Sequence, residues 1–195
     1  DERLSVLRQN HFDYEDERVI DVVIMGNEKL YNIMKEKDAI YMKEDFSDED
    51  GIRASELEAE FADMDGWNAE SDAATLLNGL GIPTEDHYTQ MADLPGAAKV
   101  KVLLAQALFG NPDILLLDEP VSGLDPRVTA EMYQLIRDLN KKDGITIIMI
   151  SHDIAAAIKY ATHILHIGEH CFFGTKKQYL ESSLGKAFTG QEGEE

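Results

Sequence analysis

Two short apolar runs, each followed at once by polar side chains, constrain the fold of this chain more than any other feature. The first run, 114–117, ends at Asp118 and Glu119, and the second run, 145–150, leads to His152. Runs this short and nearly continuous suit parallel strands that are buried on both faces. Because parallel strands deliver their last residues to one edge of a sheet, where ligands bind in open α/β folds, these side chains are candidates for a binding site.

The second half of the chain alternates strand patterns with helical patterns. The expected strands are 113–117, 145–150, 163–167 and 170–174, and the expected helices are 94–109, about 127–141, about 153–161 and about 176–183. The helix at 94–109 reads as strongly amphipathic and ends at Gly-Asn-Pro. This alternation predicts an α/β fold with a parallel sheet and flanking helices.

The first half of the chain has a different pattern. A short strand is expected at Arg3–Arg8, and helical patterns rich in Glu, Asp, Lys, Met and Ala follow, including Val19–Tyr41 and Ile52–Met64. We expect these helices to form an acidic lobe. The chain then divides into a strand and loop at 1–18, the helical lobe at 19–93, the α/β core at 94–188 and an acidic tail at 189–195.

Charge and cysteine content narrow the classes of function. The 195 residues include 18 basic and 38 acidic side chains, which give a net charge of -20. This charge repels nucleic acid and anionic lipid, so we expect neither nucleic-acid nor ribosome binding by the chain alone. The single cysteine cannot form an internal disulfide, and the sequence contains neither a signal peptide nor an apolar stretch long enough to span a bilayer. We therefore expect a cytoplasmic location and no membrane insertion.

The polar residues at the strand ends have distinct chemical abilities. Asp118 offers the carboxylate oxygens that Mg²⁺ prefers, and Glu119 offers a carboxylate that can polarise an attacking water. His152 follows a neighbouring strand and can sense a terminal phosphate. Gln9, close to the end of the first strand, can complete the site as a metal and water ligand. For two adjacent acids alone, a structural role as helix caps or solvated side chains has about the same weight as a functional role.

The flanking residues shift this balance. Leu-Leu-Leu-Asp-Glu-Pro, Ser-Gly-Leu-Asp and Ser-His-Asp together resemble the Walker B strand, D-loop and switch histidine of ATP-binding cassette (ABC) ATPases. The resemblance implies a P-loop-type sheet, with ATP and Mg²⁺ as cofactors. It implies that Asp118 and Gln9 support the metal, that Glu119 is the catalytic base, and that His152 is the switch residue. Asp125 would then couple two opposed protomers.

Two departures from the family pattern weaken the expected nucleotide site. No Gly-x-x-x-x-Gly-Lys-Ser/Thr loop, the Walker A motif that cradles phosphates, occurs in the 195 residues. The signature sequence of the family begins Leu-Ser-Gly-Gly. The segment of this chain that resembles it reads Leu-Pro-Gly-Ala, so Gly96 is kept and Pro95 stands where the family has a serine. Proline removes a hydroxyl and an N–H donor from the helix start that would face a phosphate. We expect weak or absent ATP binding and a catalytically deficient chain.

The resemblance points to two parent families. Residues 1 to about 117 resemble ABC-F ATPases, and residues from about 114 to 188 resemble importer ATPases for metal ions such as zinc. We therefore expect a truncated chimera, natural or engineered, joined near the Walker B strand. Two alternatives remain open: a non-enzymatic scaffold or interaction protein, and one half of a split ABC ATPase. A homodimer or a complementary ABC fragment is the expected partner.

Overall fold

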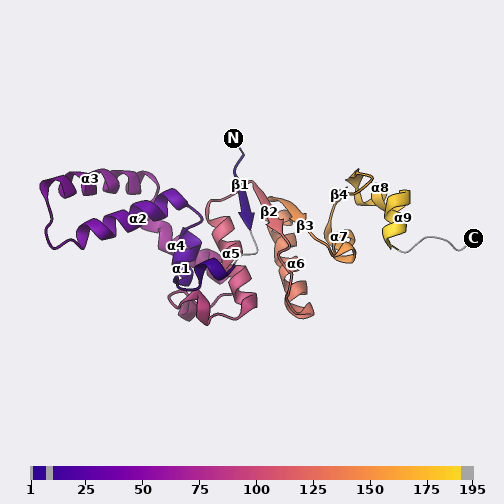
Figure 1. Cartoon of the computed structure of the whole chain (residues 1–195), viewed down its shortest axis with the longest axis horizontal. Helices are drawn as coiled ribbons and strands as arrows, with labels where there is room; N and C mark the ends of the chain where they lie inside the picture. Colours follow the sequence, from indigo (N-terminus) through magenta and orange to yellow (C-terminus); the bar gives the residue numbers. More distant parts are fainter. Residues whose placement is uncertain (1, 8–10, 190–195) are drawn as a thin grey trace, which may run out of the picture. The chain divides into compact units, whose positions relative to one another are not determined.

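The computed structural model describes residues 2–7 and 11–189. The chain forms two compact units, residues 1–148 and residues 149–195, and each is described by itself. The first unit contains β1 (Leu4–Leu7), α1 (Val19–Ile24), α2 (Glu28–Tyr41), α3 (Asp48–Asp63), α4 (Ala69–Gly79), α5 (Gly96–Phe109), β2 (Ile114–Asp118) and α6 (Pro126–Lys141). Short 3-10 helices lie at His11–Tyr14, Gly66–Asn68, Thr84–Asp86 and Met91–Asp93. Figure 1 shows the order of these elements along the chain.

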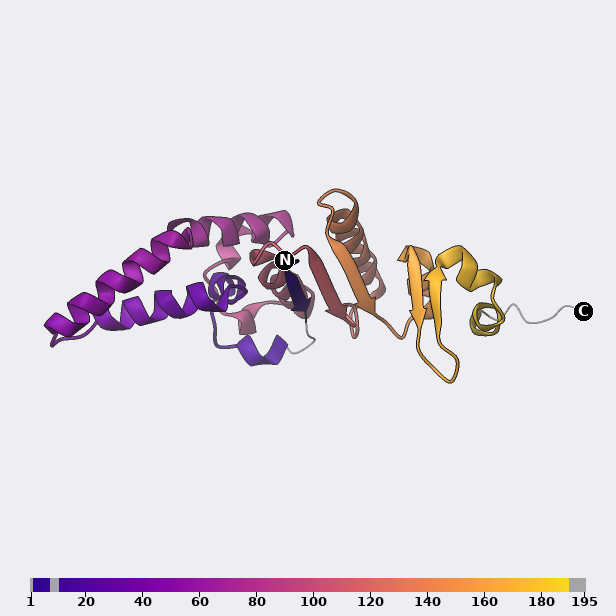
Figure 2. The ribbon, with the colours of Figure 1, turned by 90° about the horizontal axis from the view of Figure 1, so that it is seen from above.

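A parallel sheet forms the α/β part of the molecule, as predicted. β1 pairs in parallel with β2, and the register places Leu4 opposite Ile114 and Leu7 opposite Leu117. β3 (Thr146–Ile150) follows in the order β1-β2-β3, and the three arrows point the same way in Figure 2. The unit boundary falls within β3. The helix α6 connects β2 to β3, which is the strand–helix–strand unit that the alternating sequence pattern indicates.

The strands are buried on one face rather than on both, so this part of the prediction was wrong. Leu115 and Leu117 of β2 are fully buried, whereas Leu4 and Val6 of β1 and Ile148 of β3 are exposed. Burial alternates along each strand because successive side chains point to opposite faces of a sheet. A continuous apolar run cannot distinguish one covered face from two, and this ambiguity explains the error.

The core of the first unit lies around α5. This helix contacts α1, α4 and β1, and its buried residues occur all around its axis. Its amphipathic pattern in the sequence is therefore misleading, because neighbours cover it on several sides. All six residues of α1 are buried, including Asp21, whose carboxylate accepts hydrogen bonds from the Arg18 guanidinium at 2.8 and 3.0 Å.

The helix expected at Val19–Tyr41 is interrupted at Gly26. A Cβ atom at this position would lie 2.0 Å from the main-chain oxygen of Gln106 in α5, so only glycine allows this close approach. The next residue, Asn27, restarts the helix by accepting a hydrogen bond from the backbone N–H of Leu30 at 3.2 Å. The acidic lobe thus consists of a buried helix, α1, followed by a separate pair of helices, α2 and α3.

The helices α2 and α3 form an antiparallel hairpin, which we call the arm (Figure 1). Its buried residues are Leu30, Ile33, Lys37 and Ile40 from α2 and Ala54, Leu57 and Phe61 from α3. Ser47 begins α3 with a reciprocal capping box, in which Ser47 and Asp50 each accept a hydrogen bond from the other's backbone N–H. The polar sequence between the two helices therefore forms an ordered turn.

The second unit contains α7 (Ile154–Tyr160), β4 (His163–His166), β5 (Phe172–Thr175), α8 (Lys176–Glu181) and α9 (Ser183–Thr189). β4 and β5 pair antiparallel, with Leu165 opposite Phe173. Both closing strands lie within two residues of their expected positions, whereas α9 was not expected as a separate helix. The acidic tail lies outside the described residues, apart from Thr189, the last residue of α9. In the described part of the chain, the search for a helix of sufficient length and apolarity to cross a bilayer finds none.

Candidate functional site

The end of β2 presents two adjacent carboxylates. Asp118 is the last residue of the strand and is exposed, while the two leucines that anchor the strand, Leu115 and Leu117, are fully buried. Glu119 is half-buried and has a φ of 45°, which is the left-handed region that a residue with a Cβ rarely adopts. The buried leucines of β2 therefore fix the position of Asp118 and Glu119. At Glu119 the backbone turns sharply away from the sheet.

A tight turn follows these carboxylates. The backbone N–H of Ser122 donates to the carbonyl of Glu119 at 3.1 Å, and the N–H of Leu124 donates to the carbonyl of Val121 at 3.2 Å. Gly123 has a φ of 75°, a conformation that favours glycine. Local sequence thus determines a compact turn between β2 and α6.

Asp125 starts α6. Its carboxylate accepts hydrogen bonds from the backbone N–H groups of Arg127 at 3.0 Å and Val128 at 3.1 Å, and Pro126 occupies the first helical position. This contact accounts for an aspartate here without any second protomer. The coupling role that the resemblance implies for Asp125 stays a prediction.

Gln9 lies outside the described residues. The strand before it, β1, ends at Leu7, and the register places Leu7 opposite Leu117. The carboxyl end of β1 therefore lies beside the start of the acidic pair of β2, at the same edge of the sheet. This is the arrangement from which a shared site was predicted for Gln9 and Asp118.

His152 belongs to the second unit, and its setting is described within that unit. It is exposed in the turn between β3 and α7. Its neighbour Asp153 caps α7 by accepting a hydrogen bond from the backbone N–H of Ala156 at 3.0 Å, and the N–H of Asp153 donates to Ser151 Oγ at 3.0 Å. These two hydrogen bonds thus hold the backbone on both sides of the His152 imidazole.

The altered signature begins α5. Pro95 is the residue before the helix and supplies no side-chain cap, and its carbonyl accepts from the N–H groups of Ala98 at 2.9 Å and Lys99 at 3.1 Å. Gly96 is exposed, and a Cβ atom there would meet nothing within 4 Å. Packing therefore does not require glycine at position 96. The helix α5 forms although Pro95 lacks the hydroxyl of the serine found at the corresponding position of the family pattern.

The donor set at the end of β2 fits a magnesium ion that substrate phosphates complete. Mg²⁺ is commonly bound through one or two carboxylates, with waters and phosphate oxygens in its other positions. No ion pair joins the Asp118 side chain to another described residue, so within the described part of the chain its oxygens stay available to a ligand. Within residues 2–7 and 11–189, no group of three or more His, Cys, Asp or Glu side chains is arranged to hold a metal.

Comparison with known proteins identifies the family. Residues 10–157 match the family described as "AAA domain, putative AbiEii toxin, Type IV TA system". Over 163 residues, 84% of its length, the chain is 58% identical to the uncharacterized ABC transporter ATP-binding protein YkpA of Bacillus subtilis. The chain belongs to this AAA domain family, and its similarity to YkpA places it among the ATP-binding domains of ABC ATPases.

Further relatives agree with this assignment. The chain is 42% identical over 185 residues to the probable ATP-binding protein YbiT of Escherichia coli O157:H7, and 35% identical over 133 residues to the zinc import ATP-binding protein ZnuC of Cereibacter sphaeroides. These matches cover 93% and 68% of this chain. The chain spans 29% of the length of YkpA, 34% of YbiT and 54% of ZnuC.

Solved structures show the same fold. The ATP-binding cassette MJ0796, in a dimeric post-hydrolysis state bound to ADP and Pi, matches 88% of this chain and 63% of its own, with a TM-score of 0.59 and 20% identity. The ADP conformation of MJ1267, an ATP-binding cassette of an ABC transporter, matches 97% of this chain and 68% of its own, with a TM-score of 0.65 and 17% identity. At these identities the likeness extends to the fold alone.

The predicted site residues do not include a group of exposed apolar side chains at the turn of the arm. Tyr41, Met42, Phe46 and Ile52 are all exposed there. The only signal in the sequence was the presence of bulky apolar residues within the polar stretch that separates the two helices.

Proposed function

We propose that this chain supplies the carboxylate half of an ABC-type ATP-hydrolysing site. In this proposal Asp118 supports Mg²⁺ at the β- and γ-phosphates of ATP, and Glu119 accepts a proton from the attacking water. A bound Mg²⁺ would neutralise charge on the phosphates. The observation that carries the proposal is the acidic pair at the carboxyl end of β2, exposed at Asp118 and held in a left-handed backbone at Glu119.

The remaining predicted site residues have supporting roles in this proposal. Gln9 would add an amide oxygen to the metal, and His152 would donate a hydrogen bond to the terminal phosphate. Gly96 would offer the start of α5 to a phosphate, and Asp125 would lie at a contact between two protomers. Its capping bonds to Arg127 and Val128 engage one oxygen, Oδ1, and leave Oδ2 for such a contact.

The chain alone is expected to hydrolyse ATP poorly. Its 195 residues contain no phosphate-cradling glycine and lysine loop, and carboxylates without that cation repel a triphosphate. Pro95 removes a hydroxyl from the start of α5, which weakens contact with a second nucleotide further. We therefore propose that a second segment carrying such a loop, in a partner or in a longer polypeptide, completes the site.

Complementation tests this proposal. Phosphate release is measured with Mg²⁺ and ATP for the chain alone, for a polypeptide chosen to carry a Walker A loop, and for the two together. We expect turnover well below about 1 per second for the chain alone, a rise on mixing, and a loss of about 100-fold or more in the mixture when Glu119→Gln is used. Turnover of the isolated chain at ordinary enzyme rates, abolished by Glu119→Gln, contradicts the need for a second segment.

A non-enzymatic interaction role is the second candidate, and Pro95 favours it. Helix α5 forms although Pro95 has no hydroxyl to bind a phosphate. The fold is therefore kept while this phosphate contact is lost. This role predicts no rise in melting temperature with millimolar ATP and Mg²⁺, either alone or with the Walker A polypeptide. Nucleotide at 100 times its dissociation constant would stabilise the fold by about 2.7 kcal/mol, which a thermal shift detects easily.

A single parent explains the chain more simply than a chimera does. A junction at 114–117 predicts relatives that match one side of it only. The alignments with YkpA and YbiT cover 163 and 185 of the 195 residues, so each must run through this junction. We therefore propose an uninterrupted ABC-F-like origin, with the zinc-importer likeness reflecting motifs common to ABC ATPases.

A further inference from the structure

The turn of the arm exposes an apolar cluster, which we call the arm tip. It consists of Tyr41 and Met42 at the end of α2, Phe46 in the turn and Ile52 in α3. Their exposed fractions are 55%, 83%, 50% and 65%. Large apolar side chains grouped on a surface mark contact sites more often than singly scattered ones do.

The arm tip is shaped as well as apolar. The rings of Tyr41 and Phe46 stack with an interplanar angle of 5° and a centroid separation of 6.4 Å. The Phe46 ring also packs against Gly51 of α3, where an added Cβ atom would lie 3.5 Å from the ring, an ordinary van der Waals distance. A shallow hollow of about 550 Å³ adjoins this ring, lined by Phe46, Ser47, Asp48, Gly51, Ile52, Ser55 and Glu56.

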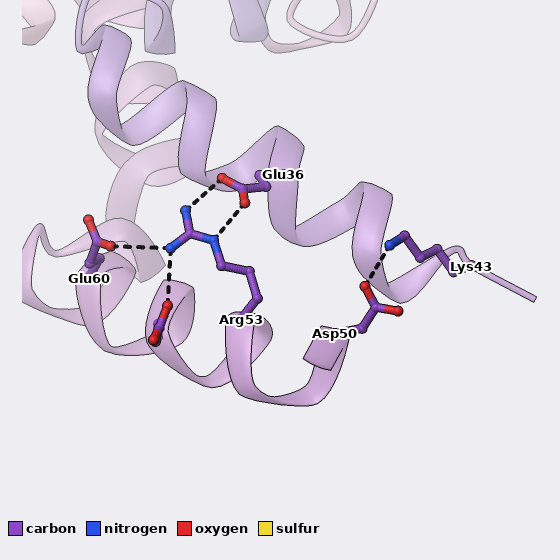
Figure 3. A network of polar contacts seen from close by, with 6 residues as sticks. Glu36, Lys43, Asp50, Arg53 and Glu60 are labelled. Atoms are coloured by element: carbon purple, nitrogen blue, oxygen red, sulfur yellow. Dashed lines mark hydrogen bonds and ion pairs between the residues drawn. The ribbon is translucent and has the colours of Figure 1, made fainter. Parts of the chain in front are cut away.

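Ion pairs and buried apolar side chains hold the two helices of the arm together. Arg53 forms a two-pronged ion pair with Glu36, at 2.7 and 2.9 Å, which joins α3 to α2. Lys43 pairs with Asp50 across the turn, and Figure 3 shows both contacts. Deeper in the hairpin, Leu57 is fully buried. Of the arm-tip side chains, Tyr41 also joins the two helices, because its hydroxyl donates a hydrogen bond to Glu58 of α3 at 3.2 Å, whereas Met42, Phe46 and Ile52 are exposed.

Acidic side chains lie close in sequence to the apolar residues of the arm tip. Glu44, Asp45, Asp48 and Glu49 are all exposed, and no ion pair joins any of them to another residue in the described part of the chain. Lys43 is occupied by Asp50 and also interacts with the charge of Asp45, and Arg53 is occupied by Glu36 and Glu56. The turn and the start of α3 thus carry an excess of negative charge, which attracts cations over a Debye length of about 8 Å at physiological salt.

We propose that the arm tip binds a basic amphipathic segment of a partner protein. A bulky apolar side chain of that segment enters the hollow beside Phe46 and Ile52. Lysine or arginine side chains flanking it face the carboxylates of Glu44, Asp45 and Glu49. Charge complementarity selects this occupant, because the excess of carboxylates beside the apolar residues opposes both an acidic partner and the phosphates of nucleic acid.

The binding site is independent of the nucleotide chemistry. It uses none of the residues at the end of β2, so a failed ATPase proposal leaves it intact. An anchor in the centre of such a contact typically carries much of the binding free energy, whereas the charged rim sets the rate of association and the salt dependence. These two contributions can be tested separately.

The test measures fluorescence anisotropy of a labelled helical peptide built from leucine and lysine, with leucines on one face, titrated with the whole chain. A scrambled peptide of the same composition and a single-stranded RNA serve as comparison probes. We expect the amphipathic peptide to bind, the scrambled peptide to bind at least about tenfold more weakly, and the RNA not to bind.

Two sets of variants locate the contact. Phe46→Ala and Ile52→Ala are each expected to weaken peptide binding about tenfold without changing the melting temperature, because both side chains are exposed. The double change Glu44→Gln with Asp45→Asn is expected to weaken binding several-fold at low salt and less at high salt. A matched double change far from the tip, Asp63→Asn with Asp72→Asn, removes equal charge and should leave binding unaltered.

Several results would overturn the proposal. Equal binding of the amphipathic and scrambled peptides, or equal losses in the tip and control charge variants, would mean general attraction to an acidic protein. Unchanged binding in both Phe46→Ala and Ile52→Ala would place the contact elsewhere. Binding of the RNA at comparable affinity would assign the tip to nucleic acid.

Discussion

The arm and the end of β2 are both acidic, but they use their carboxylates in opposite ways. In the arm, Glu36 and Asp50 pair with Arg53 and Lys43 from the opposite side of the hairpin. At the end of β2, Asp118 has no ion pair within the described residues. The described contacts therefore use Glu36 and Asp50 for the cohesion of the arm, whereas Asp118 stays available to a ligand. Position in the fold, rather than acidity, separates structural charge from candidate functional charge.

The largest expected effect separates these two groups directly. In the complemented ATPase assay, Asp118→Asn should lower phosphate release by about 100-fold and leave the melting temperature almost unchanged. Asp50→Asn removes the same charge from the arm and should leave phosphate release unchanged. Equal losses of activity in the two variants would show that both act through overall charge or stability.

The second prediction compares apolar residues that are fully buried in the two regions. Leu117→Ala in β2 and Leu57→Ala in the arm should each lower the free energy of unfolding by about 2–5 kcal/mol. Hydrogen exchange should accelerate mainly in α2 and α3 for Leu57→Ala, and in β1, β2 and α5 for Leu117→Ala. Acceleration spread uniformly over both regions in either variant would mean that the arm and the sheet unfold as one cooperative unit.

The third prediction concerns Asp125, whose carboxylate caps α6. Asp125→Ala should lower the free energy of unfolding by about 1 kcal/mol, because two backbone N–H groups lose their acceptor, whereas Asp125→Ser should restore most of the loss. Chemical denaturation measures both changes. If Asp125→Ser recovers stability but not phosphate release in the complemented assay, the carboxylate has a role beyond capping.

The smallest effect is a dependence of the arm on pH. Hydrogen bonds from Lys43, followed by those from the Ser47 backbone and hydroxyl, lower the pKa of Asp50 from 3.8 to about 2. A depressed pKa means that the stabilisation is fully present above about pH 4 and is lost as the pH falls towards 2. Carboxyl NMR should show Asp50 titrating near 2, and helical signal of the arm should fall within this window. In Lys43→Met the titration should move back towards 3.8.

Local sequence patterns were sufficient where a short segment determines its own geometry. The apolar run 114–117 predicted the strand that ends at Asp118, and the helix expected at about 127–141 corresponds to α6. These features depend on residues that are close together in the chain.

Features that depend on distant residues were not predictable. The break at Gly26 exists because Gln106, eighty residues later, comes so close that a side chain does not fit. The exposure of Ile148 depends on which face of the sheet the helices cover, and an apolar run is compatible with either outcome. The candidate site shares this limit, because Gln9 lies outside the described residues and His152 belongs to the second unit.

The left-handed backbone at Glu119 has a consequence for how this chain responds to selection. A residue with a side chain pays about 1–2 kcal/mol to hold that conformation, and glycine holds it without strain. Glycine would hold the backbone at this position without strain, but it would also remove the carboxylate of the proposed site. The position is therefore one where conformational ease and chemistry favour different residues.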